Sequence, residues 1–304
     1  MYDVSKSVFV SLIAALMIAE FSSHASAQTD QTDAKSDAEQ ALIEKWKEIY
    51  DEYIDSIKLT HSYKNGGSTL STDTQKLERE TLLSFKGDFP VASRHGKVYL
   101  WTDKGRPVII GAISSDAVEN MPEARCLGIR FNSLVAGSVT GSRFDEVFWQ
   151  CDDPGAKWKE GLSDLAPSDS RAIRLSQMKT IVRQFEASTG TNLENPCRLL
   201  PQPIYRYPEN TAGVTDGAIF SFSHGTDPKA YLQIEAREDR WLLACYRDAG
   251  RPVAVRKGDD LLWSFNDVGS QIIFQKEPFY FKYTAERRLV SDPTKIILSN
   301  WGRR

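Results

Sequence analysis

The sequence predicts an α+β protein made of two related units, each a helix packed on a curved antiparallel sheet of about four strands. Two observations lead to this prediction. A hairpin-like stretch occurs twice along the chain, and in each half a segment with apolar residues at helical spacing precedes it. A helix buries one apolar stripe and an antiparallel sheet can bury one face, so packing one on the other satisfies both.

The repeated stretch aligns without a gap: residues 96–107 read GKVYLWTDKGRP and residues 217–228 read GAIFSFSHGTDP. Glycine, β-branched, aromatic, hydroxyl and proline positions recur in register at Gly96/Gly217, Val98/Ile219, Tyr99/Phe220, Trp101/Phe222, Thr102/Ser223 and Pro107/Pro228. Residues 144–149 also match residues 258–263, but the offset falls from 121 to 114 residues. Duplication with an insertion in the first copy accounts for this change. Chance similarity between two amphipathic hairpins is the alternative.

The first unit is expected to span residues 38–151. Ser36 and Glu39 form a capping-box signature before a helix whose apolar stripe runs from Leu42 to Ile57. A strand and two hairpins should follow, bounded by turn residues. We expect them at residues 81–85, 97–102 with 108–114, and 126–134 with 138–149.

The second unit, residues 171–265, begins in the same way. A helix is expected over residues 171–188, with Gly190 as its left-handed C-cap. Strands should follow at residues 197–200, 218–223 with 229–236, and 241–246 with 253–265. Residues 152–170, rich in Pro, Gly, Asp and Ser, are the expected linker. Residues 266–304 form a C-terminal extension with possible strands at 271–275 and 279–283.

The N-terminus predicts a secretory signal peptide over residues 1–27. Lys6 supplies a positive start, Val8 to Phe21 is apolar, and Ala25 and Ala27 fit the small-x-small cleavage rule. A membrane anchor is the alternative, but this apolar run is shorter than the ~20 residues that a spanning helix needs. We therefore expect an exported protein, periplasmic or extracellular, with a disordered tail at 28–37 and no transmembrane segment after cleavage.

Composition excludes one class of partner. The chain has a net charge of −3, and 41% of its residues are hydrophobic. It can therefore build a core, but it lacks the basic balance typical of proteins that bind nucleic acid. We expect no nucleic-acid partner.

The four cysteines are expected to form two disulfides. An even count in an exported chain favours disulfide bonds. Short loops close most easily, which favours Cys126–Cys151 and Cys197–Cys245. Buried free thiols are one alternative, and a zinc site with four cysteine ligands is another. The zinc site is disfavoured because no pair has close CxxC spacing.

The sequence contains no motif for catalysis, a metal or a cofactor. No GxSxG, P-loop or GxGxxG occurs, and the histidines beyond the signal peptide, His61, His95 and His224, lack metal-site spacing. We therefore expect no catalytic residue, no metal site and no cofactor. If a ligand binds between helix and sheet, the candidate residues are Arg183, Tyr205, His224 and Tyr231.

Two stretches carry a resemblance. Residues 198–207 (RLLPQPIYRY) and 216–237 (DGAIFSFSHGTDPKAYLQIEAR) resemble a family of uncharacterised planctomycete-type bacterial proteins, most clearly over residues 171–265. The resemblance implies a bacterial envelope setting and supplies no catalytic residue. At the level of fold, a helix across a curved sheet is similar to the cystatin-like and nuclear-transport-factor-like α+β folds, which fixes no function.

These features favour a non-catalytic exported module that binds an unknown protein or small molecule. Exposed strand edges would allow a partner strand to pair. A pocket-based enzyme in one unit, a hydrolase or an isomerase, is the alternative. It would need a concave site with titratable groups at hydrogen-bond distance and perturbed pKa values. A protease inhibitor, by analogy with cystatins, is a third possibility without a matching motif.

Overall fold

The computed structural model describes residues 40–62, 75–86, 94–118, 120–135, 138–151, 157–266, 274–276 and 280–299. The chain divides into two compact units, Met1–Glu48 and Ile49–Arg304. The described part of the first unit is helical, and this helix ends at residue 55 in the second. The predicted signal peptide, its cleavage residues Ala25 and Ala27, and the predicted tail at 28–37 lie outside the described residues.

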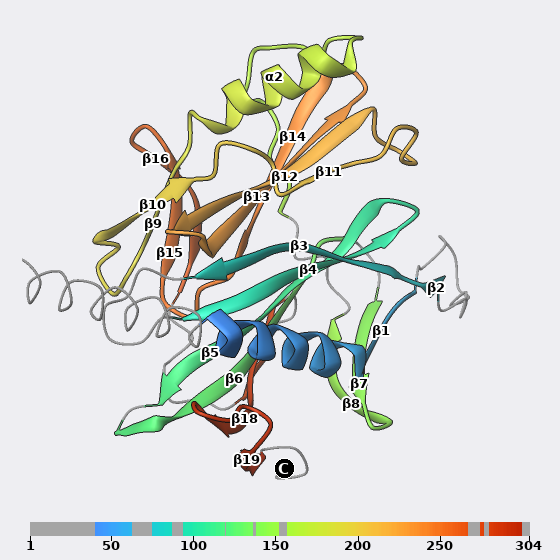
Figure 1. The fold of residues 1–304 in the computed structure, drawn as a ribbon. Coiled ribbons are helices and arrows are strands. Elements are labelled where there is room, and N and C mark those ends of the chain that lie inside the picture. Colours follow the sequence, from blue (N-terminus) through green and yellow to red (C-terminus); the bar gives the residue numbers. More distant parts are fainter. Residues whose placement is uncertain are drawn as a thin grey trace, which may run out of the picture. The chain divides into compact units, whose positions relative to one another are not determined.

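The fold is mostly β, and the prediction of α+β units is wrong (Figure 1). Within the described ranges two helices, residues 40–55 and α2 (Arg171–Val182), accompany nineteen strands. Helix α2 is shorter than predicted because residues 186–189 are extended as strand β9, so Gly190 is not its cap. The prediction failed because it gave each sheet only one buried face. In the structure, sheet also packs on sheet.

Three antiparallel sheets make up the described fold. The four-stranded sheet has the order β2 (Gln75–Lys76), β1 (Ile57–Ser62), β7 (Ser138–Arg143), β8 (Glu146–Cys151). The seven-stranded sheet has the order β17 (Phe274–Lys276), β18 (Tyr280–Leu289), β6 (Met121–Ser133), β5 (Arg106–Val118), β4 (His95–Asp103), β3 (Glu78–Lys86), with β19 (Ile296–Ser299) beside β18. The eight-stranded sheet has the order β14 (Arg240–Arg247), β13 (Asp227–Arg237), β12 (Asp216–His224), β10 (Asn195–Leu199), β9 (Glu186–Thr189), β15 (Val253–Lys257), β16 (Asp260–Phe265), with β11 (Tyr205–Arg206) beside β12.

The two copies of the repeated hairpin form as predicted and share one irregularity. Strand β4 pairs with β5, and β12 pairs with β13. In both hairpins the register shifts just before a hydroxyl-bearing residue, which then faces a proline: Thr102 faces Pro107, and Ser223 faces Pro228. The bulge therefore recurs at the offset of 121 residues seen in the sequence.

A glycine near the start of each hairpin lies against an aromatic ring of the neighbouring strand segment. A Cβ atom on Gly96 would lie 2.2 Å from the Ile113 carbonyl oxygen and 2.5 Å from the Phe85 ring, and one on Gly217 would lie 2.7 Å from the Tyr207 ring. This close approach of ring and backbone explains why glycine stands at both positions.

The predicted second hairpins are wrong in their pairing. Strand β6 pairs with β5 and with β18, and β14 pairs with β13. Neither forms a hairpin with the strand that follows it. Instead β7–β8 and β15–β16 are hairpins in their own right, with register shifts after Gly141 and after Val255. These shifts lie 114 residues apart, the second offset in the sequence.

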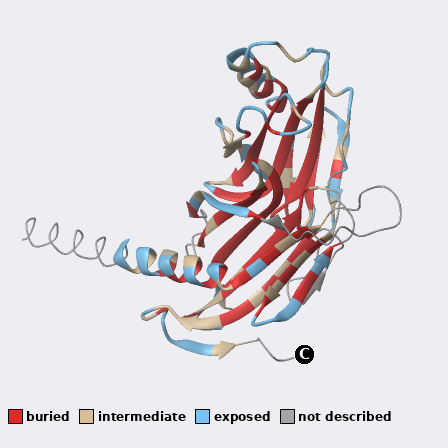
Figure 2. Cartoon of the chain, turned by 90° about the vertical axis from the view of Figure 1, so that its right-hand side faces the viewer, coloured by how far each residue is buried: buried red, intermediate tan, exposed pale blue. Residues whose placement is uncertain are grey.

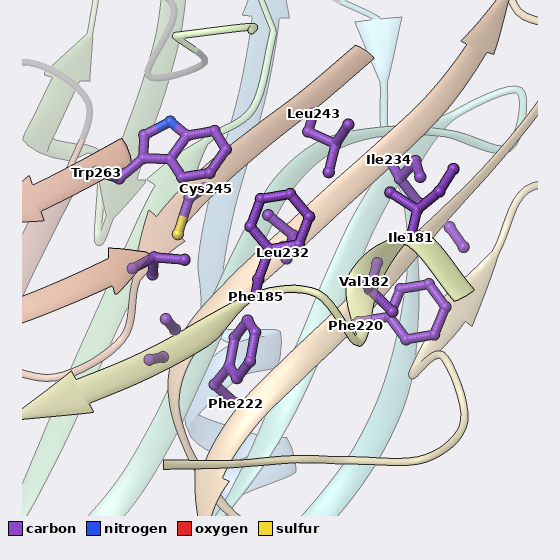
Figure 3. Packing of buried hydrophobic residues seen from close by; sticks show 14 of the residues in the cluster. Ile181, Val182, Phe185, Phe220, Phe222, Leu232, Ile234, Leu243, Cys245 and Trp263 are labelled. Carbon is purple, nitrogen blue, oxygen red and sulfur yellow. The ribbon is translucent and has the colours of Figure 1, made fainter. Parts of the chain in front are cut away.

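The described residues of Ile49–Arg304 include two apolar cores. The first lies inside the eight-stranded sheet, where Ile181 and Val182 of α2 meet Phe220, Leu232 and Leu243 (Figure 3). The second core joins the two large sheets and combines residues of β3, β4 and β5 with residues of β12, β13 and β14. As a result β12, β13 and β14 are buried along nearly their whole length (Figure 2).

The predicted disulfides are absent, because none of the four cysteines is bonded to another. Cys126 lies on β6 and Cys151 on β8, which belong to different sheets. Cys197 on β10 and Cys245 on β14 are separated by β12 and β13. Three strand spacings of ~4.8 Å give about 14 Å, well beyond the ~6 Å between the Cα atoms of a disulfide.

Candidate functional site

One face of β13 is polar and nevertheless buried. Asp227, Lys229, Tyr231, Gln233 and Glu235 alternate with apolar residues that belong to the first core. Because successive side chains of a strand point to opposite faces, this alternation is typical of a strand with one face in water. Here the seven-stranded sheet covers the polar face through the second core, so its charges must find partners inside the protein.

A cluster of charges surrounds the start of β13. The Asp227 side chain is fully buried, and its Oδ2 lies 2.5 Å from Nζ of Lys229 and 2.9 Å from a terminal nitrogen of Arg94. Nε of Arg94 lies 2.8 Å from Oδ1 of Asp116. Burial, and then the nearby Arg94, lower the pKa of Lys229. This arrangement ties the residue before β4 to β13 and so links the two large sheets.

The same cluster contains a carboxyl group, Asp248, whose buried surroundings disfavour its negative charge. Asp248 is buried and accepts a hydrogen bond from the Tyr231 hydroxyl at 3.2 Å. Its Oδ2 lies 3.2 Å from Arg130 but accepts no hydrogen bond from the described residues. Burial raises the pKa of Asp248 to about 7, although Arg94 and Lys229 oppose the shift. Asp248 is therefore the described carboxyl group most prone to hold a proton near neutral pH.

A second polar cluster surrounds Glu235, toward the other end of β13. The Tyr207 hydroxyl donates to its Oε1 at 2.7 Å, and Arg237 donates to its Oε2 at 2.6 Å. Gln233 donates to the Tyr207 hydroxyl and accepts a hydrogen bond from Tyr246 at 2.8 Å. Burial raises the pKa of Tyr207 well above its ordinary value. Both Glu235 oxygens, the Tyr207 hydroxyl and the Gln233 amide each have a partner within the protein, which is typical of a structural network.

Two predicted ligand residues lie along this interior surface. Tyr231 is fully buried beside Asp248, and burial raises the pKa of its hydroxyl. Tyr205 packs against the second core and donates to the Gly105 carbonyl at 2.7 Å. Both hydroxyls therefore serve contacts between segments of the protein.

The other two predicted ligand residues lie apart. Arg183 is the exposed residue at the C-terminal end of α2. His224 is half-buried at the end of β12, with its Nε2 3.5 Å from Sγ of Cys197. Burial raises the pKa of Cys197 to about 11 and lowers that of His224. A thiol in this state is a poor nucleophile at neutral pH. The structure thus assembles no single site from the four predicted residues.

A different His arrangement has the geometry of a relay. Nδ1 of His95 lies 2.9 Å from the Tyr50 hydroxyl, and its Nε2 lies 3.0 Å from Oγ of Ser115. All three residues are buried, and burial raises the pKa of Tyr50 above its ordinary value. A substrate could not reach the Ser115 hydroxyl in this geometry, so the contacts are structural.

A hollow of about 340 Å³ lies where the two ends of the eight-stranded sheet are bridged. Its lining comes from Lys157, Trp158 and Lys159, from Cys245 of β14, and from residues 262–265 of β16. The backbone of Lys159 exchanges hydrogen bonds of 2.8 and 3.0 Å with Leu243 of β14. The Trp263 indole of β16 donates to the Lys157 carbonyl at 3.4 Å. The predicted linker therefore spans the two edge strands and roofs a pocket.

The pocket combines aromatic rings with cations. Trp158, Trp263 and Phe265 contribute rings, and Nζ of Lys159 lies 5.6 Å from the centre of the Trp263 ring. No carboxylate lines it. Sequence reasoning missed this site because residues 152–170 have the composition of a linker. The available signal was a tryptophan between two lysines inside that polar stretch.

The described residues contain no group of three or more His, Cys, Asp or Glu side chains placed to hold a metal ion. Among the helices with described residues, none is long and apolar enough to cross a membrane. Comparison with protein-family models, curated proteins and solved structures finds no match to this chain.

Proposed function

We propose that this chain is an exported, non-catalytic binding protein and that its ligand enters the pocket between residues 157–159 and β16. The observation that carries the proposal is the pocket lining. Small-molecule sites are concave, mostly aromatic or apolar, and bear a few polar groups that fix orientation. Three rings, two lysines and a hollow of about 340 Å³ meet that description.

Binding is favoured over catalysis by the titratable groups of the pocket. The lining holds a thiol, Cys245, and a hydroxyl, Ser264, and burial raises the pKa of the Cys245 thiol far above neutral pH. Neither a histidine nor a carboxylate lines the pocket to act as a general base. Lys229, whose pKa burial lowers, and Asp248, whose pKa burial raises, are paired within the interior and do not line the pocket. Export rests on the signal-peptide pattern of residues 1–27.

The proposal is tested by filling the pocket. Ser264 is exposed and lines the hollow, so Ser264→Trp should block it while Ser264→Ala leaves it open. Ring-containing acids, amines and neutral compounds would be screened against the purified chain by ligand-observed NMR. We expect at least one compound to bind the wild-type chain and the Ala variant but not the Trp variant. Absence of any bound compound, or equal binding to the Trp variant, would overturn the proposal.

A further inference from the structure

The outer edge of β14 has one backbone position that faces the pocket. In an antiparallel strand, alternate residues turn their N–H and C=O groups to opposite neighbours. Asp248, just beyond β14, donates to the Lys229 carbonyl, as does Ala249 where the strand pattern ends, so the even-numbered residues of β14 face β13. Leu243 exchanges hydrogen bonds with Lys159, and the Arg247 carbonyl accepts from Asn132, so odd-numbered residues face outward. Cys245 lies between these two occupied positions and also faces outward.

The linker residue Lys157 does not pair with Cys245. Lys159 pairs antiparallel with Leu243, so a continued pairing would set Lys157 opposite Cys245. Instead the Lys157 carbonyl turns to the Trp263 indole, and the hollow opens at this point. Among the described residues, no backbone group pairs with the Cys245 N–H and C=O on this side, so the alternation turns them toward the pocket as at a strand edge to which one more residue can be added.

The corresponding strand edge in the first half of the chain, that of β6, is paired with another strand. Strand β6 follows the first repeated hairpin as β14 follows the second. The outer edge of β6 is covered by β18, which pairs with it from Ala124 to Asn132. The outer edge of β14 has a backbone bridge to the described part of the linker only at Leu243. The open position is therefore specific to the second copy.

The charges around the open position select the sign of the ligand. Lys157 and Lys159 both line the hollow. Glu160, the next residue along the linker, is exposed and lies 2.7 Å from Arg240. An anionic group in the pocket would lie beside two lysines, and Nζ of Lys159 is 5.6 Å from the centre of the Trp263 ring, while a cation would find no carboxylate in the lining.

We infer that the pocket binds an acylated amino acid or a peptide carboxyl terminus with a flat side chain. The amide of the ligand pairs with the Cys245 backbone, the carboxylate meets Lys157 and Lys159, and the ring packs on Trp263 and Phe265. One residue with a free carboxylate supplies each of these groups at the spacing of a strand. This inference deepens the proposed function and rests on it.

The test uses three probes on the full chain by isothermal titration calorimetry. They are N-acetylphenylalanine, its neutral carboxamide, and N-acetyl-N-methylphenylalanine, which lacks the amide donor. A charged hydrogen bond contributes ~1.5–3 kcal/mol, which corresponds to about 10- to 150-fold in affinity. We expect the carboxamide to bind at least about tenfold more weakly than the acid, and the N-methyl compound to bind several-fold more weakly.

Variants identify the groups responsible. Lys157→Ala and Lys159→Ala should weaken binding of the acid and leave binding of the carboxamide unchanged. Lys58→Ala, the same change at an exposed residue of β1, should alter neither. An N-acetyl tripeptide ending in phenylalanine separates the two sources: tighter binding than the single residue indicates a chain terminus, and equal binding indicates a free acylated amino acid.

Two results would refute the inference. The first is equal affinity for the acid and the carboxamide, and the second is an equal effect of the lysine variants on both. If these probes fail while other compounds still bind in a manner blocked by Ser264→Trp, the ligand class is wrong and the proposed function stands. If no compound binds at all, both are wrong.

Discussion

Removing the negative charge of Asp227 should destabilise the protein far more than removing a similar charge at the surface. The Asp227 side chain is fully buried, and that of Lys229 is 6% exposed. Asp227→Asn keeps the size of the side chain but leaves the Lys229 ammonium buried without an opposite charge at 2.5 Å. Arg94 retains Asp116 at 2.8 Å, so the loss falls mainly on Lys229.

The magnitude follows from this asymmetry. Breaking a buried ion pair by removing one partner costs about 3–5 kcal/mol, because the other charge stays in a low-dielectric interior. For a domain of this size, 1 kcal/mol corresponds to ~2–4 °C in Tm. We therefore expect Tm to fall by roughly 10 °C. Asp227→Asn combined with Lys229→Met should cost less than Asp227→Asn alone, because no unpaired ammonium remains.

The assay is urea unfolding followed by tryptophan fluorescence at pH 7, with thermal melts beside it. Asp55→Asn is the matched control. Asp55 also pairs with an arginine, Arg79 at 2.7 Å, but its side chain is 63% exposed. Exposed pairs contribute about 0–1 kcal/mol. If Asp227→Asn costs no more than Asp55→Asn, the buried cluster does not stabilise the junction of the two sheets.

Three further predictions concern other described residues. Folding should take up a proton near neutrality, because the folded pKa of Asp248, about 7, exceeds its ordinary value. Stability should therefore fall as pH rises from ~4 through ~7, and Asp248→Asn should flatten urea midpoints measured from pH 5 to 8. In the native protein an alkylating reagent should leave Cys245 intact and modify Cys197 slowly, since burial raises the pKa of both thiols. Mass spectrometry that finds a disulfide instead would contradict the structure. Gly96→Ala and Gly217→Ala should each cost about 1–3 kcal/mol, because the added methyl group would meet the Ile113 carbonyl oxygen and the Phe85 ring at Gly96 and the Tyr207 ring at Gly217; wild-type Tm for either variant would show that these neighbours can move away.

The local elements were predictable because their signals are local. The hairpin around Pro107 and its copy around Pro228 carry alternating apolar residues and a turn sequence, and both form as expected. The pairing of β6 with β18 was not predictable. Strand β18 lies about 150 residues further along the chain, and no repeating pattern in the sequence marks a pairing between such distant strands. The disulfide prediction came from the number of cysteines, which says nothing about strand order.

The polar face of β13 shows why the fold class was misjudged. Lys229 and Glu235 alternate with apolar residues in the pattern of a solvated sheet face. Only the arrival of Arg94 and Arg106 from the other large sheet reveals that the face is internal. The pocket was missed for a related reason, since Trp158 acquires its role from the distant strands β14 and β16. Tertiary contacts of this kind cannot be read from one sequence.

The pairing of β18 with β6 has a consequence for solubility. An uncovered strand edge is a template onto which another chain can add its own strand. Residues 280–289 occupy that edge along β6, although they lie outside the duplicated sequence. A chain truncated before Tyr280 would retain both copies of the hairpin but leave the edge of β6 from Ala124 to Asn132 without this partner strand. By pairing with this edge, the C-terminal extension prevents another chain from adding a strand to β6.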